Sequence, residues 1–295
     1  MSRIAKTACC LAAVSALALV GHAEAPSDTQ RSTDKSAFNF FNPTPLDDLR
    51  TLTTDGPGAT ESPYTVDAGH FQIEMAFVDY TSEKDTFDGV TYRLDWLAVA
   101  PLNLKVGLLN SLDLQLLLDP YNHVYEREDG ISRVTRRGFG DTTVRLKYNI
   151  WGNDHGSTAL AVMPFVRIPT SHDDIGNDSV EGGVIVPFSA DLPGDFILGL
   201  TTRFGDMEDL LDGEGHHTEF GNSIALVHQL FGDLEGYVEF FSNVSTEKDV
   251  GWVGTFDTGL VYWLTDDLQL NAGVNIGVTK WADNWNLFFG LAWRY

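Results

Sequence analysis

The sequence has very little cysteine and few basic residues, and each shortage excludes a class of protein. Its two cysteines, Cys9 and Cys10, lie in a segment that we expect to be removed as a signal peptide. The mature chain would then have no disulfide, no thiolate metal site and no cysteine nucleophile. Against 42 Asp and Glu there are only 19 Lys and Arg, a net charge of −23. Nucleic-acid binding needs basic patches, so this balance argues against a nucleic-acid partner and fits a secreted or outer-membrane protein.

Long apolar runs are also missing from the sequence. The run from Leu11 to Val20 is too short to cross a bilayer as a helix, which needs about 20 apolar residues. Arg3 and Lys6 precede this run and Gly21-His22-Ala23 follows it, which is the form of a signal peptide with its cleavage site. We therefore expect residues 1–23 to be removed.

The last nine residues of the chain, in contrast, alternate strictly. Apolar or aromatic side chains stand at every second position: Leu287, Phe289, Leu291, Trp293 and Tyr295. Because a strand sends alternate side chains to opposite faces, one face of this segment is wholly apolar. The closing strand of an outer-membrane β-barrel has this form, since one face meets lipid and the other a wet lumen. The last four of these residues resemble the assembly signal read by the barrel-assembly machinery; the alternative is an edge strand of a β-sandwich.

Eleven further segments alternate in the same way and make, with the tail, about 12 strands. Single-chain bacterial barrels have an even number of strands. In the clearest segment, Leu270 and Val274 are expected to face lipid, and Asn271 and Asn275 the lumen. The apolar faces of the eleven segments lie at 71–77, 94–106, 112–118, 142–150, 160–168, 184–190, 196–204, 220–226, 238–240, 260–264 and 268–278.

The connections between these segments alternate in length. Five short turns lie near residues 109–111, 152–156, 193–194, 232–233 and 265–267. Six longer or more polar loops are expected at Ser82 to Asp88, Glu126 to Arg137, 170–178, 206–216, 246–250 and 280–284. Outer-membrane barrels have short periplasmic turns and longer outer loops. The sequence therefore predicts an all-β fold, a transmembrane antiparallel up-and-down β-barrel over residues 64–295 in the outer membrane of a Gram-negative bacterium.

Polar residues occupy the opposite face of the expected strands. The charged side chains expected to line the lumen are Glu74, Arg93, Asp95, Asp141, Arg145, Lys147, Arg167, Arg203, Glu239 and Asp257. Because buried charges persist only when they are paired or wet, the set forms either a structural lattice of ion pairs or a polar translocation path. Twelve strands lie between small filled barrels and wide porins, so a narrow or plugged pore is expected.

Residues 24–63 precede the barrel as a separate segment, polar at first and later rich in glycine and proline. Its apolar side chains Phe38, Phe40, Phe41 and Leu49 need a place to bury. We expect the segment either to fold into the lumen as a plug or to lie under the barrel in the periplasm.

Two parts of the sequence carry a family resemblance. Thr60 to Glu74 leads into the first expected strand, and Gly138-Phe139-Gly140-Asp141, followed by Lys147-Tyr148, leads into the fourth. With these segments the chain, from about Thr53 to Tyr295, resembles the outer-membrane transporter-like family labelled "putative meta-pathway of phenol degradation". Its usual Asp-Arg-Pro is Asp55-Gly56-Pro57 here, so an arginine of the family is missing. The resemblance implies uptake of aromatic or other hydrophobic compounds.

Two histidine-containing segments are candidates for a hydrolase site and for a metal site. His155-Gly156-Ser157 has the His-x-Ser spacing of a barrel phospholipase. A pair that hydrolyses lipid should lie at the outer rim of the membrane, but this segment falls in an expected periplasmic turn. His216 and His217 follow five acidic residues between Asp206 and Glu214, a set that could hold a divalent cation. The spacing matches no known metal loop, so a solvated acidic loop is the favoured interpretation. No catalytic residue, metal or cofactor is expected.

We therefore expect a porin-like barrel that passes or binds small, hydrophobic or aromatic molecules. The alternatives are a closed structural or surface-interaction barrel without transport and, less favoured, a barrel hydrolase. The expected partners are membrane lipid, lipopolysaccharide, the assembly machinery and a small ligand.

Overall fold

The computed structural model describes residues 34–56, 58–87, 89–172, 175–209, 211 and 215–295, with the backbone of residues 17 and 18. The helical elements of this part are two short 3-10 turns, η2 (Lys35–Ala37) and η3 (Leu46–Asp48). No helix in it is both long and apolar enough to cross a membrane. The expected signal peptide lies outside the described residues, apart from the two-residue strand β1 (Leu17–Ala18), which pairs with β2 (Thr54–Asp55).

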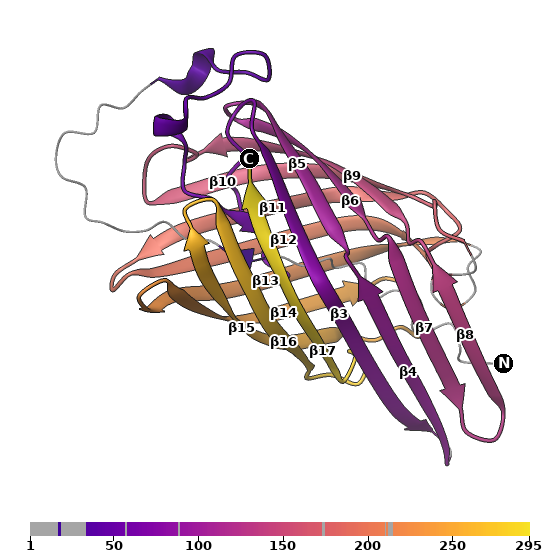
Figure 1. Cartoon of the computed structure of the whole chain (residues 1–295). Coiled ribbons are helices and arrows are strands. Elements are labelled where there is room, and N and C mark those ends of the chain that lie inside the picture. Colours follow the sequence, from indigo (N-terminus) through magenta and orange to yellow (C-terminus); the bar gives the residue numbers. More distant parts are fainter. Residues whose placement is uncertain are drawn as a thin grey trace.

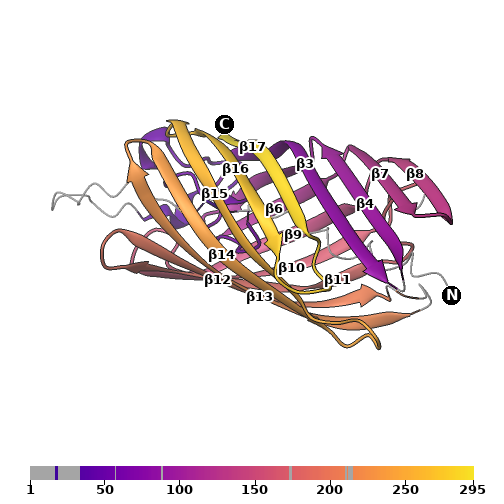
Figure 2. The ribbon, with the colours of Figure 1, turned by 90° about the horizontal axis from the view of Figure 1, so that it is seen from below.

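The other strands form one antiparallel sheet that closes into a barrel because β17 pairs with β3 (Figures 1 and 2). They are β3 (Phe71–Phe87), β4 (Val90–Val99), β5 (Leu102–Leu109), β6 (Leu112–Leu118), β7 (Tyr121–Glu128), β8 (Ser132–Gly138), β9 (Thr142–Trp151), β10 (Thr158–Ile168), β11 (Glu181–Leu192), β12 (Phe196–Glu208), β13 (His216–Phe231), β14 (Leu234–Ser245), β15 (Val253–Thr265), β16 (Leu268–Gly277) and β17 (Trp285–Arg294). β4 and β5, β6 and β7, and β8 and β9 each continue one another, so the wall has 12 strands. The predicted fold is confirmed.

Two of the three divided strands are broken at residues that disturb a β ladder. Pro101 and Pro120 lack the N–H that a ladder needs, and Ala100 before Pro101 has a positive φ of 57°. β3 consequently pairs with β5 through its first residues and with β4 through its last. In Figure 1, β4, β7 and β8 extend the wall at the end far from the C-terminus.

Two of the expected outer loops are strand instead. Ser82 to Phe87 continue β3, and most of Glu126 to Arg137 belongs to β7 and β8, which pair through Glu128 and Ser132 around a short turn. Most side chains of Ser82 to Thr86 and of Glu126 to Arg137 are polar, so the apolar alternation that marks the other strands is absent. Main-chain pairing holds these strands in the sheet, together with side-chain contacts such as the ion pair between Arg136 and Glu126.

Side chains alternate around the wall as a membrane barrel requires. On β17, Phe289 and Trp293 are exposed on the outer face, while Phe288 and Ala292 are buried on the inner face. On β16, Gln269 and Asn271 are buried in the same way. The outward face is apolar along most strands, as expected for lipid contact.

Arg93 and Asp95 were expected in the lumen, and the structure corrects this. Thr81 is buried on the inner face and pairs across the sheet with Trp96, so Trp96 also lies on the inner face. Asp95, which precedes Trp96 on β4, therefore lies on the outer face. There Asp95 accepts hydrogen bonds from the hydroxyls of Tyr80 (2.7 Å) and Ser82 (3.0 Å). The break between β4 and β5 shifts the alternation by one residue, which moves every side chain of β4 to the opposite face.

A candidate site in the lumen

The chain enters the barrel from the end that holds the C-terminus. η2 and η3 lie at this rim (Figure 1), and residues 52–56 and 58–68, here called the inner segment, pass into the lumen. Leu52 is 1% exposed and packs among the inward side chains of β13 to β17, which are Ala225, Val227, Tyr237, Val261, Trp263 and Phe288. The described N-terminal residues therefore lie partly at this rim and partly in the lumen.

The apolar anchor differs from the four expected ones. Phe40 and Phe41 are exposed at the rim, where Phe40 lies edge-on to Phe71 on the outer face, with ring centroids 6.2 Å apart. Phe38 and Leu49 are only half-buried. Leu52 reaches the apolar cluster instead, and Tyr64 of the inner segment packs against the same cluster.

Asp55 holds the inner segment by a buried cluster of charges. Its carboxylate forms ion pairs with Lys105 of β5 and Lys147 of β9, and all three side chains are at most 2% exposed. Gln115 donates to the same carboxylate at 2.8 Å. The backbone N–H of Asp55 donates in turn to Glu74, at 3.0 Å from Oε2. Because buried ions are costly unless paired, the two lysines and Asp55 depend on one another.

A second set of contacts holds the inner segment to the wall at residues 59–61. The carboxylate of Glu239 on β14 accepts hydrogen bonds from the backbone N–H groups of Ala59 (2.6 Å) and Thr60 (2.8 Å). Gly58 leaves room for this carboxylate, because a Cβ at position 58 would lie 2.8 Å from Oε2 of Glu239 and displace it. Glu61 accepts from Nη1 of Arg145 at 2.7 Å.

A third set of contacts joins the segment to the rim. Nη1 of Arg50 donates to Asp154 in the β9–β10 turn at 2.9 Å. Burial opposes ionisation of Asp154, but a hydrogen bond from Asn110 and the charge of Arg50 lower the pKa of its carboxyl overall. Arg294, at the end of β17, donates to the carbonyl of Arg50 at 2.5 Å and pairs with Asp267. Arg50 is therefore tied both to the β9–β10 turn and to the last strand of the barrel.

The other predicted lumen residues also lie on the inner face. Asp141 and Glu181 flank the guanidinium of Arg167 at 3.2 Å and 3.1 Å. Asp257 lies opposite Glu239 on the neighbouring strand and accepts from the Thr255 hydroxyl at 3.0 Å. Glu74, Lys147, Arg145 and Glu239 contact the inner segment, so the structure brings four predicted residues together around it. Asp55 and Glu61, the partners within that segment, were not predicted, because no periodic pattern marks them.

The inner segment leaves space on two sides of the lumen. One space lies beside Thr54 and Gly56 and reaches Asn271, Asn275 and Asn286. The other lies beside Ala59 and Glu61 and is lined by Arg145, Arg203 and Phe241, among others. Both have polar and apolar walls, which suits small amphipathic molecules.

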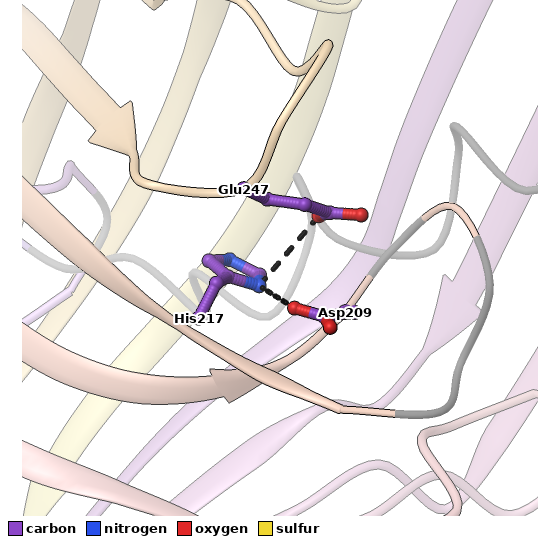
Figure 3. A group of neighbouring side chains, drawn as sticks. All are labelled: Asp209, His217 and Glu247. Atoms are coloured by element: carbon purple, nitrogen blue, oxygen red, sulfur yellow. Dashed lines mark hydrogen bonds and ion pairs between the residues drawn. The ribbon is translucent and has the colours of Figure 1, made fainter.

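A separate cluster lies among the loops at the opposite end (Figure 3). Nδ1 of His217 faces Oδ1 of Asp209 at 3.2 Å and Oε2 of Glu247 at 3.6 Å, and its Nε2 faces Glu219 at 3.4 Å. The His217 side chain is only 2% exposed. The expectation of a solvated acidic loop is therefore wrong for this histidine. Imidazole and carboxylates are ligand types for divalent cations, and the same contacts suit a protonated imidazole. Glu247, on a different loop, could not be assigned to the cluster from sequence spacing.

The His155-Gly156-Ser157 segment lies exposed in the turn between β9 and β10. This turn is at the same end as the C-terminus and the rim contacts of Arg50. It is therefore far from the end where the outer loops gather, as the sequence predicted.

Comparison with known proteins gives a family and a fold. The model of a family described as "Putative MetA-pathway of phenol degradation" matches residues 54–295. The chain is similar to the COG4313 outer membrane channel from Pseudomonas putida F1, with a TM-score of 0.60 and 13% identity over 81% of this chain and 99% of that one. It is also similar to the transport unit of the autotransporter AIDA-I from Escherichia coli, with a TM-score of 0.49 and 12% identity over 76% and 90% of the two chains. A search of curated proteins gives no match. The barrel is thus an outer-membrane barrel of the kind found in Gram-negative bacteria.

Proposed function

The chain belongs to the family described as "Putative MetA-pathway of phenol degradation", and on this premise we propose that it is a channel for small hydrophobic or aromatic molecules. The observation that carries the proposal is the inner segment, which passes through the lumen and, apart from its chain connection to β3, is held to the wall by non-covalent contacts. Its attachment consists of ion pairs, hydrogen bonds and the apolar contacts of Leu52 and Tyr64. Such an attachment allows release.

The passage that we propose runs beside the inner segment. The end with both the rim contacts and the short turns is the periplasmic end, by the rule for outer-membrane barrels. Solute from the outer side would meet Arg203 and Phe241 first and the Asp55 cluster later. Residues 24–63 would act as the plug, residues 64–295 as the barrel, and the apolar outer face of β17 as the assembly signal.

A closed structural barrel is the second candidate, and one observation favours it. The cluster of Asp55, Lys105, Lys147 and Glu74 is buried and saturated with hydrogen bonds, which resembles a permanent lattice. In that case the lumen would stay shut under all conditions.

Planar-bilayer conductance of the refolded protein distinguishes the two candidates. The full chain and a chain lacking residues 24–63 are compared at matched protein amounts, after heat-modifiable migration on a detergent gel has established that both barrels are folded. Transport predicts higher conductance to small solutes in the shortened chain. Equal, near-zero conductance from two folded barrels would favour the closed structural barrel.

A further inference from the structure

Arg203 is a cation in the lumen that lacks an acidic partner. It lies on β12 and is only half-buried, but its Nε is buried without a hydrogen-bond partner. Its contacts in the described part of the chain are the ring of Phe165, 4.7 Å from the guanidinium carbon, and a weak contact from Nη2 to Sδ of Met207 at 3.9 Å. No carboxylate among the described residues forms an ion pair with it.

The neighbouring arginines are paired, which makes Arg203 different. Arg145 holds Glu61, and Arg167 holds both Asp141 and Glu181. These two guanidinium groups repel Arg203, whereas the charges of Glu219 and Glu181 attract it. A guanidinium that stays charged in such surroundings needs an anion or water to face it.

The space in front of Arg203 has a second unpartnered donor. Arg145 lines the same space, is 5% exposed and has an Nε that is buried without a hydrogen-bond partner. The hydroxyl of Thr201 and the side chains of Asn222 and Ser223 add polar groups to the same wall. Two guanidinium groups beside hydroxyl and amide groups match a planar carboxylate, which accepts paired hydrogen bonds from arginine.

The rest of the wall is apolar. Ile185 and Phe241 line the space, and Phe165, which lies under the guanidinium of Arg203, packs with Ile185 and Met163 in a buried cluster. A bound molecule would therefore meet charge at one end and hydrocarbon at the other. An inorganic anion would leave the apolar wall uncovered, and a neutral aromatic would leave Arg203 without a partner.

We propose that Arg203 and Arg145 bind the carboxylate of an aromatic acid, with its ring against Ile185 and Phe241. The inference rests on the proposed function, because it assigns a substrate class to the channel. Passage of the acid past the inner segment would begin from this site, since Glu61 of that segment is the present partner of Arg145.

Benzoate and its neutral isostere benzamide test the site. Isothermal titration of the full-length, detergent-folded barrel should give tighter binding of benzoate than of benzamide. Arg203→Gln should weaken benzoate binding at least about tenfold and leave benzamide almost unchanged, because a hydrogen bond to a charged group contributes about 1.5–3 kcal/mol. Arg127→Gln is the matched control, since Arg127 lies on the β7–β8 hairpin with its side chain 43% exposed.

The outcomes separate this inference from the proposed function. Equal binding of benzoate and benzamide by the unchanged protein, or an unchanged preference in Arg203→Gln, overturns the site even if the shortened chain conducts. If Arg203→Gln does not fold, Arg203→Lys should fold, keep the preference for benzoate and bind it more weakly, because lysine is a single point donor. Selective benzoate binding by a barrel that never conducts would support the site and reject the channel.

Discussion

Phe71 and Tyr295 exchange two main-chain hydrogen bonds, from N–H of Phe71 at 3.0 Å and from N–H of Tyr295 at 2.8 Å. The first residue of β3 and the last residue of the chain therefore close the barrel at the rim that holds the C-terminus. The aromatic side chain of Tyr295 lies on the outer face, 79% exposed, and its ring centroid is 5.8 Å from that of Trp293.

Two changes at Tyr295 separate closure from assembly signalling. Tyr295→Ala keeps both main-chain hydrogen bonds and removes the aromatic ring, whereas deletion of Tyr295 removes all three. If the ring is part of the assembly signal, both variants should reach the outer membrane more slowly, as measured by the heat-modifiable fraction after pulse labelling. Normal assembly of Tyr295→Ala with slow assembly of the deletion would assign the effect to the hydrogen bonds.

Opposite faces of β16 should respond differently to charge. Val274→Arg places a cation on the lipid face, which costs about 2–4 kcal/mol at mid-bilayer. Asn275→Arg places it in the lumen beside Asn286, whose amide donates to Asp79 at 2.5 Å. The folded fraction, measured by heat modifiability, should therefore fall more in Val274→Arg. Equal damage, or the reverse order, would show that the register is displaced.

Asp55→Asn should release the inner segment. The substitution leaves the ammonium groups of Lys105 and Lys147 without their shared carboxylate, and loss of one partner of a buried ion pair costs about 3–5 kcal/mol. The expected result is higher single-channel conductance from a barrel that remains heat-modifiable. Asp47→Asn, at an exposed position in η3, is the matched control and should conduct like the unchanged protein. Conductance of Asp55→Asn no higher than that of the control would reject a plug held by this cluster.

Asp283 should make the loop between β16 and β17 sensitive to pH. Burial, with repulsion from Glu83 and Asp79, raises the pKa of its carboxyl to about 7. An unfolded Asp titrates near 3.9, so the folded state binds more protons between about pH 4 and 7, and stability falls as pH rises through this range. Asp283→Asn removes this loss. Guanidinium unfolding at pH 5 and pH 8 should show a stability gain from Asp283→Asn that is larger at pH 8; an equal gain at both pH values would contradict it.

Sequence patterns determined the wall of the barrel. Strands β9 to β17 carry one apolar and one polar face, and period two is sufficient to assign those faces when a strand is unbroken. The segments Thr60 to Glu74 and Gly138 to Asp141 carried the family resemblance. The buried state of Lys147 and Glu239 followed from the same periodicity, although their partners did not.

Tertiary structure alone decided how the lumen is filled and which face β4 presents. Asp55 meets Lys147 across 92 positions of sequence, and Glu247 meets His217 from another loop. Neither contact leaves a periodic signal, because the inner segment and the loops have no regular repeat. Arg93 and Asp95 face outward for a related reason: the break between β4 and β5 reverses the alternation of β4 relative to β5, and only the main-chain pairing reveals it.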